Sequence, residues 1–228
     1  MYYAADEEKE IMLIYIVRHG ETRSNVEGYL QGWTDDPLND NGVALAEITG
    51  RAMRGITFDV CYSSPLKRAR KTAEIVLRES GNAGVPIQFE NRIKEIQMGD
   101  YEGKKFRPGE RDPIIDESQL KIFFTDAFHF AGFPGGENIR QVCVRTQSFL
   151  KELISRDDGK TYLMTTHGFA LRAMLNYLYD DPSDFWHGHV PYNCAVNIIE
   201  AKNGNVRLIA DDKIYYDMAC AVDRYAKY

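Results

Sequence analysis

Two histidines stand directly after apolar runs that have the composition of buried strands. In the stretch YIVRHGETRSN the apolar run gives way to Arg18 and His19, and in TYLMTTHG a second run gives way to His167. A neutral imidazole is a competent nucleophile toward phosphorus and can form a covalent intermediate. Arginine supplies a permanent charge and paired donors that suit phosphoryl oxygens. These residue types therefore point to phosphoryl transfer.

A third junction, in YSSPLKRAR, places Arg68 just after another short apolar run. Gly20 allows close approach of the backbone, and the helix N-termini that follow such junctions offer N–H groups to an anion. Each feature alone also fits an ordinary structural role. A histidine at a strand end is usually a hydrogen-bonded structural residue, KRAR is usually a solvated helix face, and Glu95 is usually surface charge. Their combination carries the functional interpretation.

The elements that must position these residues alternate between strands and helices. Apolar runs predict strands over residues 11–17, 58–64, 85–90 and 161–166, and a hairpin over 193–211 that turns at Asn203-Gly204. Helical spacing is present over residues 42–53, 65–80, 118–128, 138–155 and 169–179. This order predicts an α/β fold, a three-layer sandwich with a mostly parallel central sheet and helices on both faces. Ligands of such sheets bind beyond the carboxyl ends of the strands, where His19, Arg68 and His167 are expected.

The composition is that of a globular protein, with 228 residues, 44% hydrophobic residues and 12% aromatic residues. We expect one domain over residues 1–228, with residues 1–10 as a flexible extension that is too acidic and polar for a secretory signal. No apolar run is long enough to cross a membrane, and the net charge of −6 argues against a nucleic-acid partner. Four scattered cysteines favour a reducing, cytoplasmic location. The oligomeric state is left open.

Six segments of the chain resemble, in the same order, the conserved segments of the histidine phosphatase superfamily, also called the phosphoglycerate mutase-like family. They are RHGETRSN, LQGWTDDPLNDNG, SSPLKRARKTAEI, IKEIQMGDYEG, PGGEN and TTHGFALR. The resemblance covers roughly residues 11–210, nearly the whole chain. RHG alone is a weak motif, whereas all six segments in order are specific. Two small departures, Ile93 and Tyr101, stand where the family commonly has leucine and tryptophan.

The resemblance implies a role for each matched residue. His19 would be the nucleophile that becomes phosphohistidine, and Glu95 would protonate the leaving oxygen and then activate water. His167 completes the catalytic set. The residues implied to hold the phosphoryl group or to line its pocket are Arg18, Asn25, Arg68 and His167, and then Thr22, Gln31 and Gly32. Arg68 is preferred to its neighbours because it matches the family position, and Arg70 should point away from it.

The family divides into phosphatases and phosphoglycerate mutases, which share the phosphohistidine and differ in the acceptor that attacks it. Family members that resemble the cofactor-dependent mutases carry asparagine and serine after the second His-Gly, and they have an insertion with paired arginines and a proline run. This chain has Phe169 and Ala170 there, and residues 99–136 contain neither feature. The resemblance therefore favours a phosphatase acting on a small phosphorylated substrate, with the mutase as runner-up. The phosphatase chemistry is expected to need no metal and no cofactor, because the arginines and His167 would neutralise the developing charge, whereas the runner-up is a cofactor-dependent phosphoglycerate mutase.

Residues 99–136 are expected to form a lid over the site, since binding loops diverge while the scaffold stays. Four of its cations could bind remote anionic groups of a substrate or form a solvated turn; they are Lys104, Lys105, Arg107 and Arg111. A cluster of five of its phenylalanines favours core packing over a substrate platform; they are Phe123, Phe124, Phe128, Phe130 and Phe133. His187 and His189 are expected to be structural or pocket-wall residues rather than metal ligands. Two rival classes remain, a metal-dependent hydrolase with His19, Glu95 and His167 as ligands, and a non-catalytic phosphate-binding module.

Overall fold

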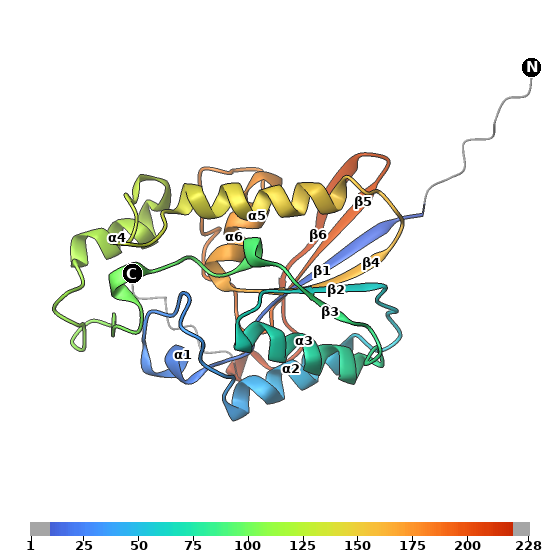
Figure 1. Cartoon of the computed structure of the whole chain (residues 1–228), viewed down its shortest axis with the longest axis horizontal. Coiled ribbons are helices and arrows are strands. Elements are labelled where there is room, and N and C mark those ends of the chain that lie inside the picture. Colours follow the sequence, from blue (N-terminus) through green and yellow to red (C-terminus); the bar gives the residue numbers. More distant parts are fainter. Residues whose placement is uncertain (1–9, 221–228) are drawn as a thin grey trace, which may run out of the picture.

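A six-stranded sheet forms the centre of the computed structural model, which describes residues 10–220 (Figure 1). Its strands are β1 (Met12–Arg18), β2 (Val60–Ser63), β3 (Ile87–Phe89), β4 (Thr161–Thr166), β5 (Val196–Lys202) and β6 (Asn205–Lys213). They are arranged in the order β3-β2-β4-β1-β5-β6, and β1 to β4 are mutually parallel. β5 and β6 complete the sheet as an antiparallel hairpin. The predicted mostly parallel sheet is confirmed.

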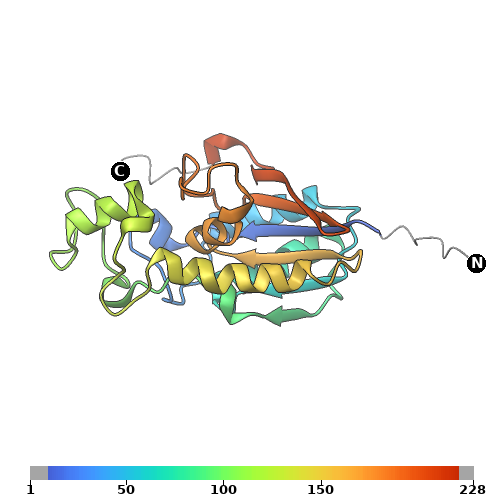
Figure 2. The ribbon, with the colours of Figure 1, turned by 90° about the horizontal axis from the view of Figure 1, so that it is seen from above.

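Helices cover both faces of this sheet, as the alternating pattern predicts. They are α1 (Arg23–Glu27), α2 (Asp40–Ala52), α3 (Lys67–Ser80), α4 (Glu117–Thr125), α5 (Ile139–Ile154) and α6 (Gly168–Leu175). α2 and α3 lie on one side of the sheet, and α5 and α6 lie on the other (Figures 1 and 2). On β1, Ile14 and Ile16 pack in one cluster with Phe149 of α5, while Val17 packs with Val76 of α3. Burial on both faces explains the continuous apolar run of this strand.

The predicted hairpin turn is present between β5 and β6. Asn203 and Gly204 both have positive φ, 51° and 78°. Two such residues in sequence match the turn type that suits the twist of a two-residue hairpin. This hairpin forms one edge of the sheet, on the side of β1 away from β4.

The segment 99–136 projects beyond the end of the sheet, with α4 at its far side (Figure 1). Phe123, Phe130 and Phe133 are buried in one cluster with Phe169 of α6 and Trp186, and Phe124 and Phe128 pack against it. The predicted core packing of these aromatic residues is confirmed. Whether the segment acts as a lid stays a prediction.

Other expectations concern the limits of the chain and its cysteines. Residues 1–9 of the predicted extension lie outside the described residues. All four cysteines fall within residues 10–220, and each is a free thiol. Among the described residues, no helix combines the length and apolar character needed to span a bilayer.

Candidate active site

The carboxyl ends of β1 and β4 bring the two predicted histidines together. The strands are adjacent and in register, with Arg18 opposite Thr166, and the His19 N–H donates to the Thr166 carbonyl at 2.9 Å. Both imidazoles are buried, and their ring centroids lie 5.1 Å apart. Residues almost 150 positions apart therefore form one site, as expected at the rim of a parallel sheet.

The sharp exit from β1 depends on Gly20. A Cβ on this residue would lie 2.5 Å from the Gly42 carbonyl oxygen at the start of α2, closer than two such atoms can approach. The N–H of Gly20 donates to Thr72 Oγ1 of α3 at 3.0 Å. The glycine after His19 thus lets the chain turn tightly beneath two helices, which fixes the direction of the imidazole.

His19 is held in one tautomer. Its Nδ1 lies 2.7 Å from the carbonyl oxygen of Gly20, which can only accept, so Nδ1 carries the proton. Nε2 is then left with its lone pair. Burial, followed by the charges of Arg68 and Arg18, lowers the pKa of His19 well below its ordinary value. The imidazole is therefore neutral at neutral pH and presents Nε2 as a nucleophile.

Arg68, at the start of α3, faces that lone pair. Its Nε lies 3.3 Å from His19 Nε2, and its two terminal nitrogens donate to the carbonyls of Gly32 and Thr34 at 2.7 Å each. Burial lowers the pKa of Arg68 to about 10, so the guanidinium keeps its charge at neutral pH. Arg70 points outward and pairs with Glu74, as its helical position predicts.

Two buried nitrogens beside His19 have no partner in the described structure. They are Nε of Arg18 and Nδ1 of His167. The same side chains are anchored elsewhere, since Arg18 donates to the Pro191 carbonyl and His167 Nε2 lies 2.8 Å from Ser64 Oγ. A buried polar group without a partner is costly, and a bound oxyanion would offset that cost for both.

Glu95 enters the site from the connection between β3 and α4. Its carboxylate accepts the N–H groups of Phe169 and Ala170 at 3.2 and 3.0 Å, and that of Ile96 at 2.9 Å. Two N–H groups at the α6 N-terminus, those of Phe169 and Ala170, therefore bind the carboxylate of Glu95. Burial raises the pKa of Glu95 although these bonds favour the charged form.

A narrow pocket opens over Arg18, His19 and Glu95, whereas Arg68 and His167 lie behind His19 and are not among the lining residues. Its lining residues are Arg18, His19, Asn25, Tyr29, Leu30, Gln31, Glu95, Met98, Gly168, Phe169 and Val190. Asn25 and Gln31 line the pocket, and the expectation that Asn25 holds a phosphoryl oxygen stays a prediction. Thr22 lies behind Gln31, to which its hydroxyl donates at 2.9 Å. Gly32 contributes the carbonyl that holds Arg68, and contact of Thr22 or Gly32 with a substrate stays a prediction.

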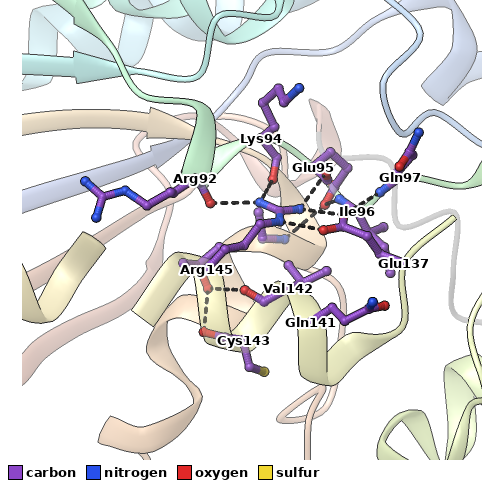
Figure 3. Close-up of polar contacts among 12 residues, drawn as sticks. Arg92, Lys94, Glu95, Ile96, Gln97, Glu137, Gln141, Val142, Cys143 and Arg145 are labelled. Atoms are coloured by element: carbon purple, nitrogen blue, oxygen red, sulfur yellow. Dashed lines mark hydrogen bonds and ion pairs between the residues drawn. The ribbon is translucent and has the colours of Figure 1, made fainter. Parts of the chain in front are cut away.

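Three supporting residues escaped the motif analysis. The Glu102 carboxylate accepts the N–H groups of Gly32, Trp33, Thr34 and Met98 at 2.6–3.2 Å. Asn193 donates to the His19 carbonyl at 2.9 Å, and Arg145 donates to the Glu95 carbonyl at 2.9 Å (Figure 3). Their partners are mainly backbone atoms, which leave no residue pattern in a sequence. Of the three, Glu102 alone could have been noticed in the sequence, because it lies within the matched segment IKEIQMGDYEG.

The cations of segment 99–136 lie outside this pocket lining. Lys104, Lys105 and Arg111 form ion pairs with Asp112, Glu110 and Glu117. Arg107 donates to the carbonyl of Asn25 at 3.4 Å. The geometry favours the solvated turn over a second anion site.

The remaining histidine pair has protein partners of its own. His187 stacks on Tyr179 with 3.7 Å between the ring centroids, and His189 Nδ1 lies 3.0 Å from the Val190 carbonyl. Over residues 10–220, no three His, Cys, Asp or Glu side chains are grouped so that they could share a metal ion.

The chain is similar to a large set of known proteins. A model described as histidine phosphatase superfamily (branch 1) matches residues 14–211. A 2,3-bisphosphoglycerate-dependent phosphoglycerate mutase of Cytophaga hutchinsonii is 32% identical over 77% of this chain and 81% of its own. A broad-specificity phosphatase of Saccharomyces cerevisiae is 29% identical over 87% of this chain and 84% of its own. Among solved structures, Bacillus stearothermophilus YhfR has a TM-score of 0.79 and 31% identity, with 89% of this chain and 98% of that one covered.

Proposed function

This chain belongs to the histidine phosphatase superfamily (branch 1), and we propose that it hydrolyses small phosphomonoesters through a phosphohistidine at His19. The observation that carries the proposal is the set of groups around His19 Nε2. A neutral, oriented nucleophile faces Arg68, and two unpartnered buried nitrogens of Arg18 and His167 lie beside it. Such a set suits a phosphoryl group and its transition state.

The first half-reaction transfers the phosphoryl group from substrate to enzyme. Nε2 of His19 attacks phosphorus, the P–O bond to the leaving group breaks, and the leaving oxygen takes a proton from Glu95. Arg18, Arg68 and His167 stabilise the charge on the non-bridging oxygens. In the second half-reaction, the Glu95 carboxylate takes a proton from water, which attacks the phosphohistidine and releases phosphate.

Hydrolysis is preferred to mutase activity because of the pocket walls. Leu30, Met98, Phe169 and Val190 are buried and apolar, and among the described residues 10–220 Arg18 is the one cationic side chain in the pocket lining. A phosphoglycerate has anionic groups at both ends, so its far end would be desolvated here without a cationic partner. The similar proteins carry both names, so an assay is required to choose.

The nucleophile is tested with His19→Ala. Because no other residue in the described part of the chain is placed to accept the phosphoryl group, turnover of p-nitrophenyl phosphate should fall by several orders of magnitude, on the order of 10⁴-fold or more. His129→Ala is the matched control, since His129 is exposed on the far segment and pairs only with Asp126. A His19→Ala variant with near-wild-type turnover would show that the assignment is wrong.

The reaction type is tested with 3-phosphoglycerate and 2,3-bisphosphoglycerate. The phosphatase should release inorganic phosphate from other phosphomonoesters and should not isomerise 3-phosphoglycerate. Rapid isomerisation without release of phosphate would establish the mutase instead.

The two rival classes predict other results. A metal-dependent hydrolase would lose its activity to a chelator, whereas the phosphohistidine enzyme would keep it. A non-catalytic phosphate-binding module would bind vanadate and turn over no ester in a panel of phosphorylated metabolites. The intact set of Arg18, His19 and Arg68 beside Glu95 favours turnover.

A further inference from the structure

Arg145 lies on α5, outside the pocket, yet it contacts the loop that carries Glu95 (Figure 3). One terminal nitrogen donates to the carbonyls of Arg92 and Lys94 at 2.8 and 2.6 Å. The other donates to the Glu95 carbonyl at 2.9 Å. Its Nε and this second nitrogen donate to the two oxygens of Glu137 at 2.8 and 2.9 Å.

All five N–H groups of this guanidinium are therefore used, and three of them bind consecutive parts of one loop. The loop needs such a partner because residues 94–98 belong to no strand or helix, so their carbonyls lack regular backbone donors. Fork geometry matters here, because an ammonium group presents three donors from one point and cannot reach all five acceptors.

Glu137 extends the same arrangement past Glu95. Its carboxylate accepts the Gln97 N–H at 2.9 Å, and its own N–H donates to the Gln97 carbonyl at 2.8 Å. The backbone is thus held on both sides of Glu95, at Arg92 and Lys94 before it and at Gln97 after it. The carboxyl end of the side chain is held separately, by N–H groups of α6.

We propose that Arg145 is a positioning residue, which fixes the backbone of Glu95 so that its carboxyl group meets the leaving oxygen of the substrate. The proposal rests on the proposed function, in which Glu95 is the proton donor. Small displacements of a catalytic group carry a large penalty, about 100-fold in rate for a shift of about 1 Å. The loss of Arg145 should therefore appear in the proton-transfer step rather than in all steps equally.

The test compares two aryl esters of similar shape. p-Nitrophenyl phosphate has a leaving group that departs as a stable anion, and phenyl phosphate has one that requires a proton. The quantity measured is kcat/KM, which reports the transfer of the phosphoryl group to the enzyme. For Arg145→Gln we expect a loss of about 10- to 100-fold with phenyl phosphate and less than about 3-fold with p-nitrophenyl phosphate.

Two further variants make the result specific. Arg145→Lys keeps the charge without the fork and should also lose more activity with phenyl phosphate. Arg140→Gln is the matched control, because Arg140 lies on the same helix but is exposed and rests over the Phe128 ring. The kcat/KM of this control should stay within about twofold of the wild-type value with both esters. If Arg145→Gln does not fold, Arg145→Lys decides, through the ratio of its kcat/KM with p-nitrophenyl phosphate to its kcat/KM with phenyl phosphate.

Equal losses with both esters, or a wild-type ratio in Arg145→Lys, would overturn the positioning role and leave the proposed function standing. Wild-type protein that hydrolyses neither ester would overturn the proposed function, and this inference with it. The two failures are therefore distinguishable in one set of assays.

Discussion

At the scale of single residues, His19 and Glu95 have pKa values shifted in opposite directions. Burial and two arginines lower the pKa of His19, whereas burial raises the pKa of Glu95. The first half-reaction proposed above requires a neutral imidazole and a protonated carboxyl group. Activity should therefore fall on the acidic side only below the ordinary pKa of histidine, and on the alkaline side above the ordinary pKa of glutamic acid.

The variant Glu95→Gln separates the acidic limb of the pH profile, where activity falls as His19 is protonated, from the alkaline limb, where activity falls as Glu95 is deprotonated. Glutamine cannot titrate, so the alkaline limb of kcat/KM that Glu95 causes should disappear, while the acidic limb due to His19 stays. Turnover of phenyl phosphate should fall by about 100-fold or more. The profile is measured for wild type and variant with the same ester, so that the titration of the substrate itself cancels. An alkaline limb that is unchanged in the variant would remove Glu95 from the role of acid.

The sequence predicted the relative positions of the histidines and the arginine that directly follow strands. His19, Arg68 and His167 follow predicted strands, and a parallel sheet brings such positions to one rim whatever their separation in the chain. Glu95 is different, because only the family resemblance distinguished it from a surface carboxylate. Its burial and its α6 partners depend on how two distant loops fold together.

At the scale of elements, one carboxylate joins two loops that support Arg68, the arginine proposed to bind the phosphoryl group. Glu102 binds the backbone of residues 32–34, and the carbonyls of Gly32 and Thr34 in turn hold Arg68. Charge-assisted bonds of this kind are about twice as strong as neutral ones. The position of Arg68 thus depends on a residue that does not touch it.

Glu102→Gln should weaken binding of an oxyanion. The amide keeps one acceptor oxygen but loses the charge and places an NH₂ group opposite backbone donors. We expect the inhibition constant for vanadate to rise by about 5- to 10-fold, which corresponds to about 1–1.4 kcal/mol. Glu110→Gln is the control, because Glu110 forms an exposed ion pair with Lys105. An unchanged vanadate constant in Glu102→Gln would show that the loop holds Arg68 without this carboxylate.

The regular elements were predictable where their apolar pattern is strong, and less so where packing is non-local. The strand predicted over 161–166 coincides with β4, and the helix predicted over 138–155 is α5 with one more residue at each end. The helix predicted over 118–128 instead stops at Thr125, and a short 3₁₀ turn follows from Ala127 to His129. Asp126 between them leaves helical geometry, with a φ of −150°. The residues around Asp126 contain no local pattern that predicts this break, and the residues on either side of it pack against α6 and Trp186.

At the scale of the whole molecule, the aromatic cluster joins segment 99–136 to the active site. Phe123 is fully buried, and its ring meets those of Phe130, Phe133, Phe169 and Trp186 at centroid distances of 4.9–5.7 Å. The backbone of Phe169 donates to Glu95. The segment is thus part of the core that supports Glu95, the proposed proton donor, and a lid motion would have to keep or re-form these contacts.

Phe123→Ala tests how far the segment and the core are one cooperative unit. Removing this ring leaves a cavity among its neighbours, and such substitutions lower the free energy of unfolding by about 3–5 kcal/mol. Phe89→Ala makes the same change on the edge strand β3, where the side chain is 56% exposed, and should cost less than about 1 kcal/mol. Urea denaturation followed by circular dichroism measures both. If Phe123→Ala unfolds like wild type, the cluster contributes little to the core, and segment 99–136 is a detachable lid whose packing the site does not need.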